Sequence, residues 1–281
     1  MKFGFVTCVK LGYSCIKKIY EINGILNLII SFNDNIGKQK SGRIYLDDFC
    51  SKNDIPLLKV KHINDPETVN SIRKYNIDWL FIIGWSQIAS KEVVDSPNMG
   101  CIGAHPTLLP IGRGRASIPW SIIKNLDYAG LTFFKIDEGV DTGDILYQEK
   151  IKINDDETAT TLYEKINKTH ANIIEKIWDD LLINKISLIK QNDLVATYWE
   201  GRKPSDGQLF ESMGVEEVDR LVRATTKPYP GAFYILDNSA KIIIWSGTII
   251  SKPNKSNFYI KFSDGYYSVD KYEKYDLNSS D

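Results

Sequence analysis

The chain has little that would fix a metal, a disulfide framework or a membrane anchor. Its 281 residues include four cysteines and three histidines. The cysteines are scattered and form no Cys-x-x-Cys pair, so we interpret them as buried free thiols and predict no metal site. No apolar run approaches the ~20 residues that a membrane-spanning helix needs, and the first ten residues lack an export signal. These absences favour a cytoplasmic protein without a membrane partner.

An excess of charge of one sign is lacking as well. Lys and Arg total 35 against 36 Asp and Glu, the net charge is −1, and no segment is a basic block. Proteins that bind nucleic acid need clustered cations to meet phosphates, so nucleic acid is not a predicted partner. With 43% hydrophobic residues, and at roughly 150 residues per domain, the chain can form one large domain or two unequal ones.

Several common catalytic motifs are absent. The first expected strand-to-helix turn, residues 7–12, has no Gly-x-Gly-x-x-Gly, and the chain contains no Gly-x-x-x-x-Gly-Lys-Ser/Thr. Dinucleotide binding through that turn and phosphate-loop chemistry therefore have no support. Ser86 lacks the flanking glycines of a nucleophile elbow, which disfavours a serine hydrolase.

The first part of the chain alternates short apolar runs with helical patterns, as is typical of a parallel sheet covered by helices. The patterns predict strands over residues 2–6, 25–32, 79–84, 100–104 and 129–135. A long helix is expected from Asp156 to Leu182, with an apolar stripe of Leu162, Ile166, Ile173, Ile174, Ile177, Trp178 and Leu181. His170 lies on this stripe and is interpreted as structural. The predicted fold is α/β, with an open, mostly parallel, Rossmann-like sheet.

A polar, turn-rich stretch at residues 200–207 separates a smaller second part. One amphipathic helix is expected at 213–224, followed by strands at 232–236, 241–246, 258–262 and 266–269. We predict a catalytic domain over 1–203 and a small β-rich, OB-like domain over 204–281, with a frayed end over 271–281.

His105 is the one histidine in a loop with a restricted backbone. Pro106 and Pro110 limit φ on its carboxyl side, and Arg113-Gly114-Arg115 follows. A histidine held at a strand end can take a proton or hydrogen-bond a developing oxyanion, although capping of a turn explains it equally well. The two arginines fit phosphate binding or capping of the next helix.

A second polar segment, Asp137 to Asp144, places several carboxylates around two glycines after another strand. Its spacing does not fit a calcium loop. Carboxyl ends of parallel strands share one crevice, so we expect Asp141 to lie near His105 and to orient and charge it. A solvated acidic loop is the alternative.

Two of these motifs resemble the formyltransferase family that uses 10-formyltetrahydrofolate. They are Gly100 to Gly114, with the core Gly-Ala-His-Pro-Thr-Leu-Leu-Pro, and Gly139 to Leu146. Residues 201–207 and 223–233 are similar to the carboxyl-terminal part of the same family. The Pro-Tyr-Pro-Gly-Ala-Phe form of 228–233 and the segment 84–87 look more like enzymes that formylate an amino group on a nucleotide-linked sugar than like methionyl-tRNA formyltransferase.

The resemblance implies roles for individual residues. His105 and Asp141 match two members of the family's catalytic Asn, His and Asp, whereas Gly103 stands where the family has Asn. Either another donor, such as the His105 imidazolium, a backbone N–H, a water or Gln87, stabilises the oxyanion, or the rate is low, or the chemistry differs. Pterin binding is implied for Trp85, Gln87, Ile88, Ala89, Asp137, Glu138, Gly139 and Val140, and we assign substrate binding to Thr107, Arg113, Gly114 and Arg115.

The resemblance thus implies a sugar N-formyltransferase. The donor is 10-formyltetrahydrofolate, no metal takes part, and the acceptor is a dTDP-, UDP- or GDP-linked amino sugar of surface polysaccharide (lipopolysaccharide O-antigen) biosynthesis. A methionyl-tRNA formyltransferase, a formyltetrahydrofolate hydrolase and a non-catalytic binder are the alternatives. The oligomeric state stays open, with a homodimer among the options.

Overall fold

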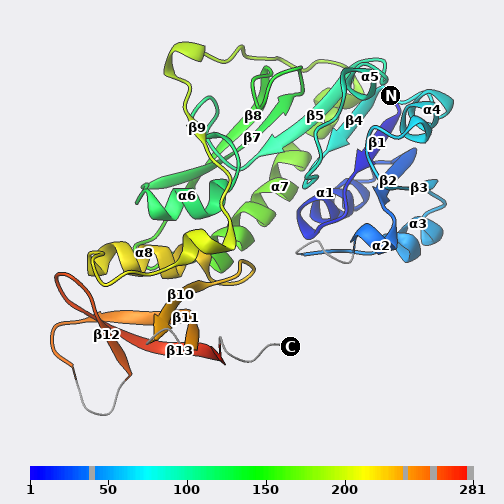
Figure 1. The fold of residues 1–281 in the computed structure, drawn as a ribbon. Coiled ribbons are helices and arrows are strands. Elements are labelled where there is room, and N and C mark those ends of the chain that lie inside the picture. The colour runs from blue at the N-terminus through cyan, green and yellow to red at the C-terminus, as the bar shows by residue number, and fades with distance from the viewer. Residues whose placement is uncertain (38–41, 237–239, 254–257, 277–281) are drawn as a thin grey trace. The chain divides into compact units, whose positions relative to one another are not determined.

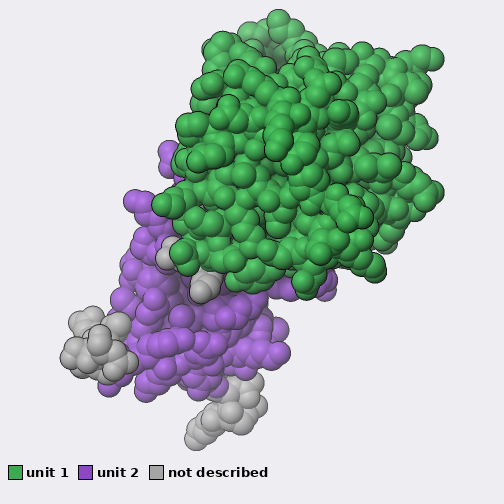
Figure 2. All heavy atoms as spheres, turned by 90° about the vertical axis from the view of Figure 1, so that its right-hand side faces the viewer, with its two compact units in different colours: residues 1–114, 130–151, 165–198 green, residues 115–129, 152–164, 199–281 purple. Residues whose placement is uncertain are grey.

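The computed structural model describes residues 1–37, 42–236, 240–253 and 258–276 (Figure 1). The chain forms two compact units, coloured green and purple in Figure 2. Unit 1 comprises residues 1–114, 130–151 and 165–198, and unit 2 comprises 115–129, 152–164 and 199–281. The sequence predicts a single domain boundary at residue 203. In the structure the chain enters unit 2 three times, and the last change from unit 1 to unit 2 falls between Tyr198 and Trp199.

A seven-stranded sheet forms the centre of unit 1, in the order β3-β2-β1-β4-β5-β7-β8. The first five of these strands in that order pair in parallel, which confirms the predicted mostly parallel sheet. β1 and β2 are buried along their whole length, as continuous apolar runs covered on both faces should be. The strands are β1 Phe3–Val6, β2 Leu28–Phe32, β3 Leu57–Val60, β4 Trp79–Ile82, β5 Gly100–His105, β7 Tyr128–Lys135 and β8 Ile145–Lys152.

The helices follow the strands in the order expected of an α/β fold. They are α1 Lys10–Glu21, α2 Asp34–Gly37, α3 Asp47–Lys52, α4 Pro66–Lys74, α5 Lys91–Val94, α6 Ser117–Ile123, α7 Ala159–Leu182 and α8 Val215–Thr225. The sequence patterns did not predict α2, α3, α5, β3 or β8. A buried apolar cluster joins one face of the sheet to α4 and includes Val6, Leu28, Ile30, Ile72 and Leu80.

The long helix α7 buries the stripe that the sequence predicts. Its seven apolar residues are at most 4% exposed. Near its end, the Trp178 ring lies 4.5 Å from the Phe3 ring, centroid to centroid, so the helix is fixed against β1. Burial of this stripe, rather than intrinsic helix propensity, stabilises a helix of this length.

His170 on α7 has the environment of a structural residue. It is 2% exposed, its Nδ1–H donates to the Ile166 carbonyl at 2.9 Å, and its ring packs edge-on against Phe133. Burial lowers the pKa of His170 to about 4, because the charged form would lose its hydration. The side chain is therefore a neutral core histidine at physiological pH.

Acid is expected to destabilise the protein through His170. Because the folded-state pKa lies below the unfolded value of about 6.5, the unfolded chain binds the extra proton, and stability falls as pH drops from 6.5 towards 4. The loss reaches about 3 kcal/mol. Between pH 6.5 and 4, the free energy of unfolding of His170→Met, measured in denaturant, should fall by about 3 kcal/mol less than that of wild type. His62→Met, at an exposed position, is the control, and an equal fall for His170→Met and wild type would contradict the assignment.

The pairing of β5 with β7 differs from the expected parallel arrangement. These strands are antiparallel, and Ile102 lies opposite Lys135 while His105 lies opposite Thr132. The end of β7 therefore does not share an edge with His105. The segment from Asp137 to Asp144 turns back instead, because the Lys135 N–H donates to the Asp144 carbonyl at 2.8 Å.

Unit 2 contains a four-stranded antiparallel sheet in the order β10-β11-β13-β12. Its strands are β10 Ala232–Leu236, β11 Ala240–Ile250, β12 Tyr259–Lys261 and β13 Tyr266–Asp276. Val218 and Val222 of α8 share its buried core with Ile242 and Tyr267. The strands that the structure describes form an open sheet, whereas the OB-like expectation implies a barrel.

The predicted frayed end at 271–281 is wrong for residues 271–276. They continue β13, with Asp276 opposite Ala240, while 277–281 lie outside the described residues. The remaining short elements are β6 Arg113–Gly114, β9 Tyr198–Trp199 and the 3-10 turns Asp193–Val195 and Pro204–Gly207. Among the described helices, none combines the length and the apolar character that crossing a bilayer requires.

Candidate active site

His105 ends β5 and is held by acceptors on both sides of its ring. Its Nε2 lies 2.7 Å from the Gly112 carbonyl oxygen, and its Nδ1 lies 3.4 Å from Oδ2 of Asp141. The residue is 7% exposed. The predicted proximity of His105 and Asp141 is confirmed, although the loop that brings them together turns back from an antiparallel strand.

The two contacts define what the His105 ring can do in this arrangement. A carbonyl oxygen only accepts, so Nε2 carries a hydrogen. Nδ1 lies at ion-pair distance, 3.4 Å, from a carboxylate oxygen, which also only accepts. A ring between two acceptors donates hydrogen bonds, whereas a general base needs one nitrogen free. The geometry favours His105 as a hydrogen-bond donor.

Asp141 has an unusual backbone for a residue that is not glycine. Its φ is +57°, in the left-handed region, which costs of the order of 1 kcal/mol. Oδ2 of Asp141 accepts from the Gly114 N–H at 2.9 Å, so the same oxygen faces both this amide and His105. Loop contacts therefore fix the carboxylate where it can orient the imidazole.

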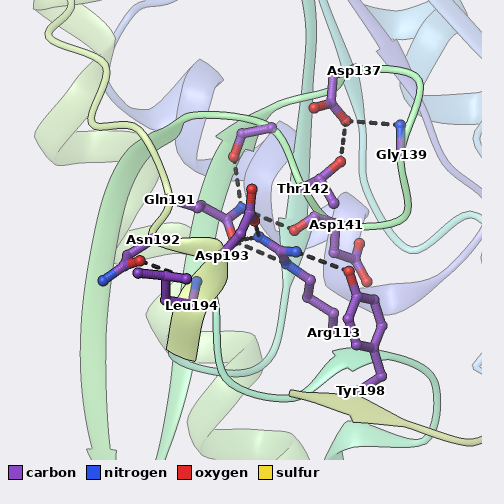
Figure 3. Close-up of polar contacts among 11 residues, drawn as sticks. Arg113, Asp137, Gly139, Asp141, Thr142, Gln191, Asn192, Asp193, Leu194 and Tyr198 are labelled. Carbon is purple, nitrogen blue, oxygen red and sulfur yellow. Dashed lines mark hydrogen bonds and ion pairs between the residues drawn. The ribbon is translucent and has the colours of Figure 1, made fainter. Parts of the chain in front are cut away.

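Asp137 braces the start of the same loop. Its Oδ1 accepts from the Gly139 N–H at 3.0 Å and from the Thr142 hydroxyl at 2.6 Å, as Figure 3 shows. A Cβ at Gly143 would lie 1.7 Å from the Lys135 carbonyl oxygen, so only glycine fits there. The glycines of this segment serve close backbone approach rather than metal binding. In the described part of the chain, His, Cys, Asp and Glu form no group of three or more with metal-binding geometry.

Gly103 is packed closely by the strand next to it. A Cβ at this position would lie 3.0 Å from Cζ of Phe134 and 3.1 and 3.2 Å from two carbons of Ile136. These side chains occupy the space into which a residue at 103 would project. A side chain at position 103, such as the family's asparagine, would therefore require Phe134 and Ile136 to shift by a few tenths of an ångström.

The residues for which pterin binding is implied lie in two loops of unit 1. Trp85 stacks on Phe32 with ring centroids 3.7 Å apart, and Ile88 is 80% exposed. The Gln87 amide accepts from the Ile63 N–H and donates to the Lys61 carbonyl. Both ends of the Gln87 amide thus bind the connection between β3 and α4. The amide N–H that is used there does not serve as the oxyanion donor that the sequence suggested.

A cavity of about 680 Å³ is lined mainly by residues 91–100 and 135–138, and neither His105 nor Asp141 is among its lining residues. Its lining includes Ala89 from the first loop and Asp137 and Glu138 from the second, together with Lys91 and Lys135. Nζ of Lys91 lies 2.5 Å from a Glu138 carboxylate oxygen, and this hydrogen bond is the largest influence raising the pKa of Lys91. Three of the eight predicted pterin residues thus line a cavity large enough for a bicyclic ring and its substituent.

The four residues assigned to substrate binding have different environments. Arg113 is 2% exposed, with its guanidinium directed into unit 1, whereas Arg115 is exposed and belongs to unit 2. The Gly114 N–H is used by Asp141. Thr107 is 3% exposed, and its hydroxyl has no hydrogen-bond partner among the described residues.

Gln191 is a site residue that the sequence patterns did not reveal. It is 6% exposed and contacts both Arg113 and the backbone of Asp141. It lies in the irregular segment after α7, in the run Lys-Gln-Asn-Asp, which has no motif or periodicity. Nothing in a single sequence marks such a residue.

Comparisons with known proteins agree with this architecture. A family model described as formyl transferase matches residues 28–177. Methionyl-tRNA formyltransferase from Lachnospira eligens is 32% identical over 195 residues, covering 69% of this chain and 61% of that protein. The bifunctional polymyxin resistance protein ArnA of Wigglesworthia glossinidia brevipalpis is 31% identical over 247 residues, covering 88% of this chain and 36% of that protein. The chain therefore spans less than two thirds of the length of either relative.

A solved structure has a similar fold over the full length of this chain. The sugar 3N-formyl transferase WlaRD, determined in the presence of dTDP and 5-N-formyl-THF, superimposes with a TM-score of 0.71 at 19% identity. The superposition covers 100% of this chain and 99% of that one. The fold match supports what the family model and the sequence relatives show directly: this chain belongs to the formyl transferase family.

Proposed function

We propose that the protein transfers the formyl group of 10-formyltetrahydrofolate to the amino group of a nucleotide-linked amino sugar. The observation that carries the chemistry is the clamp on His105, with Gly112 on one ring nitrogen and Asp141 on the other. Within the formyl transferase family, a buried imidazole at this strand end suits the stabilisation of charge on the formyl oxygen.

The donor is expected to bind in the cavity lined by Ala89, Asp137 and Glu138. The folate supplies an activated formyl carbon, and the chain supplies the surroundings. Backbone groups of residues 85–89 and 137–141 are assigned to hold the pterin. The folate binds here as a substrate and leaves as tetrahydrofolate.

His105 is assigned as hydrogen-bond donor to the oxygen that gains charge when the amine adds to the formyl carbon. In this structure the Nε2–H donates a hydrogen bond to the Gly112 carbonyl, so the assignment requires this N–H to exchange that carbonyl for the formyl oxygen when the donor is bound. Asp141 favours the charged ring and fixes its orientation. This assignment supplies the donor that Gly103 cannot. The proton lost by the amine then passes to solvent or to the departing folate nitrogen.

The choice of acceptor rests on charge. Residues 199–281 contain eleven Lys and Arg against twelve Asp and Glu, so this region has no cationic excess with which to meet a polynucleotide. A nucleotide sugar carries only two phosphates and needs a few local cations, for which Arg115, exposed in unit 2, is available. Surface polysaccharide synthesis is the setting that this acceptor implies.

Methionyl-tRNA formyltransferase is the second candidate, and the identity to the Lachnospira enzyme favours it. A single panel decides between the two. The protein is incubated with 10-formyltetrahydrofolate and either dTDP-, UDP- and GDP-linked amino sugars or charged initiator tRNA, and products are identified by mass spectrometry. We expect a formamido sugar from at least one nucleotide sugar and no formylated tRNA. Formylation of the tRNA alone would overturn the sugar assignment.

A further inference from the structure

Gln191 connects a buried arginine to the loop that carries Asp141. Its Oε1 accepts from Nε of Arg113 at 3.1 Å and from Nη2 at 2.8 Å. Its Nε2 donates to the carbonyl oxygens of Asp141, at 2.9 Å, and Gly143, at 2.7 Å. Figure 3 shows Gln191 between Arg113 and the acidic loop. Since a guanidinium only donates, the orientation of the amide is fixed by its partners.

The two carbonyls that Gln191 binds flank Thr142, directly after the strained residue. Asp141 keeps a left-handed backbone at φ +57°, which persists only when surrounding contacts impose it. Gln191 supplies two such contacts from a segment 50 residues away in sequence. Loss of these contacts would let the backbone relax and would move the carboxylate away from Nδ1 of His105.

Arg113 is in turn held from several sides within unit 1. Besides its two bonds to Gln191, Nη2 donates to Oδ1 of Asp193 at 2.7 Å and Nη1 donates to the Tyr198 hydroxyl at 2.9 Å. Four of its five N–H groups are thus used by neighbours, and the residue is 2% exposed. A guanidinium so engaged has little left to offer a phosphate.

We propose that Arg113 and Gln191 are positioning residues that act through Asp141, and that Arg113 does not bind substrate. They orient the loop so that the Asp141 carboxylate stays against the His105 ring. This inference rests on the proposed function for its kinetic consequences. It replaces the substrate-binding role that the sequence suggests for Arg113.

Gln191→Glu separates the two halves of the connection. The carboxylate still accepts from Arg113, but it cannot donate to the carbonyls of Asp141 and Gly143. We expect kcat to fall by about 10²-fold, because a displacement near 1 Å at the reacting group has that effect, while KM for either substrate changes less than about threefold. Arg113→Lys, which cannot reproduce the planar fork, should show the same pattern. Lys190→Ala, at the exposed residue on the other side of Gln191, is the matched control.

A second measurement keeps the inference independent of turnover. The chain has three histidines, so their ring ¹⁵N resonances can be assigned. In Gln191→Glu the His105 resonances should shift while those of His62 stay in place. Unchanged His105 resonances in a folded variant, or kcat within twofold of wild type, would overturn the proposal. If wild-type protein transfers no formyl group, the proposed function fails, while the ¹⁵N comparison still decides the positioning role.

Discussion

Replacing His105 with asparagine is expected to slow formyl transfer by about 10³-fold and to leave the fold intact. The imidazole reaches from the Asp141 carboxylate to the Gly112 carbonyl, and the shorter amide cannot span both or place a ring N–H at the formyl oxygen. Losses of this size are typical when a proton-carrying group or an oxyanion donor is removed. Steady-state kcat with 10-formyltetrahydrofolate and the active acceptor measures the effect.

Two further variants make the His105 result specific. His62→Asn changes an exposed histidine and should keep wild-type turnover. Combining His105→Asn with Asp141→Asn should be no slower than His105→Asn alone, because residues that act as one unit are not additive. A melting temperature within about 4 °C of wild type shows that the fold survives. Turnover within tenfold of wild type in folded His105→Asn would remove the residue from its assigned role.

Gly103→Asn is expected to damage the protein rather than improve it, although it restores the family's residue. The new Cβ would press on Phe134 and Ile136 at 3.0 to 3.2 Å, which is tighter than ordinary packing. Overpacking of this kind costs about 1–3 kcal/mol of stability, and movement of β5 would displace His105, two residues on. We therefore expect a lower free energy of unfolding in denaturant and at least a tenfold lower kcat, a loss of the order that misplacement of a catalytic group produces.

A compensating change distinguishes crowding from other effects at Gly103. Gly103→Asn combined with Ile136→Ala removes two of the three close contacts and should recover part of the lost stability. Gly201→Asn is the matched control, because a Cβ there lies at least 3.5 Å from its neighbours and should change stability by less than about 0.5 kcal/mol. Full stability with faster turnover in Gly103→Asn would instead show that the site still accepts the amide.

The sequence predicted those parts of the fold whose signal is local or periodic. The seven apolar positions of α7 recur at helical spacing, and all seven are buried. The parallel strands β1 and β4 are short apolar runs, as is typical of strands covered on both faces. His105 and Asp141 were found because each lies at or beyond the end of a predicted strand, and the structure brings them within 3.4 Å.

What escaped prediction depends on pairing between distant segments. Nothing local in residues 128–135 states that β7 runs antiparallel to β5. The exposed end of β13, Lys271–Asp276, is held by its bonds to β11 and not by burial, so its charged sequence indicated fraying. Gln191 is recognised only through Arg113 and Asp141, which lie 78 and 50 residues before it.

The release of tetrahydrofolate with and without the amino acceptor tests the account most directly. Wild-type protein is mixed with 10-formyltetrahydrofolate. Tetrahydrofolate and the formamido sugar are then measured over time, with the active nucleotide sugar present or omitted. The account predicts that both products appear in equal amounts and only when the amine is present, since the clamped His105 ring serves addition of an amine to the formyl carbon. Tetrahydrofolate release at the same rate without acceptor would identify a hydrolase, and no release with any acceptor would show that this site does not transfer formyl groups.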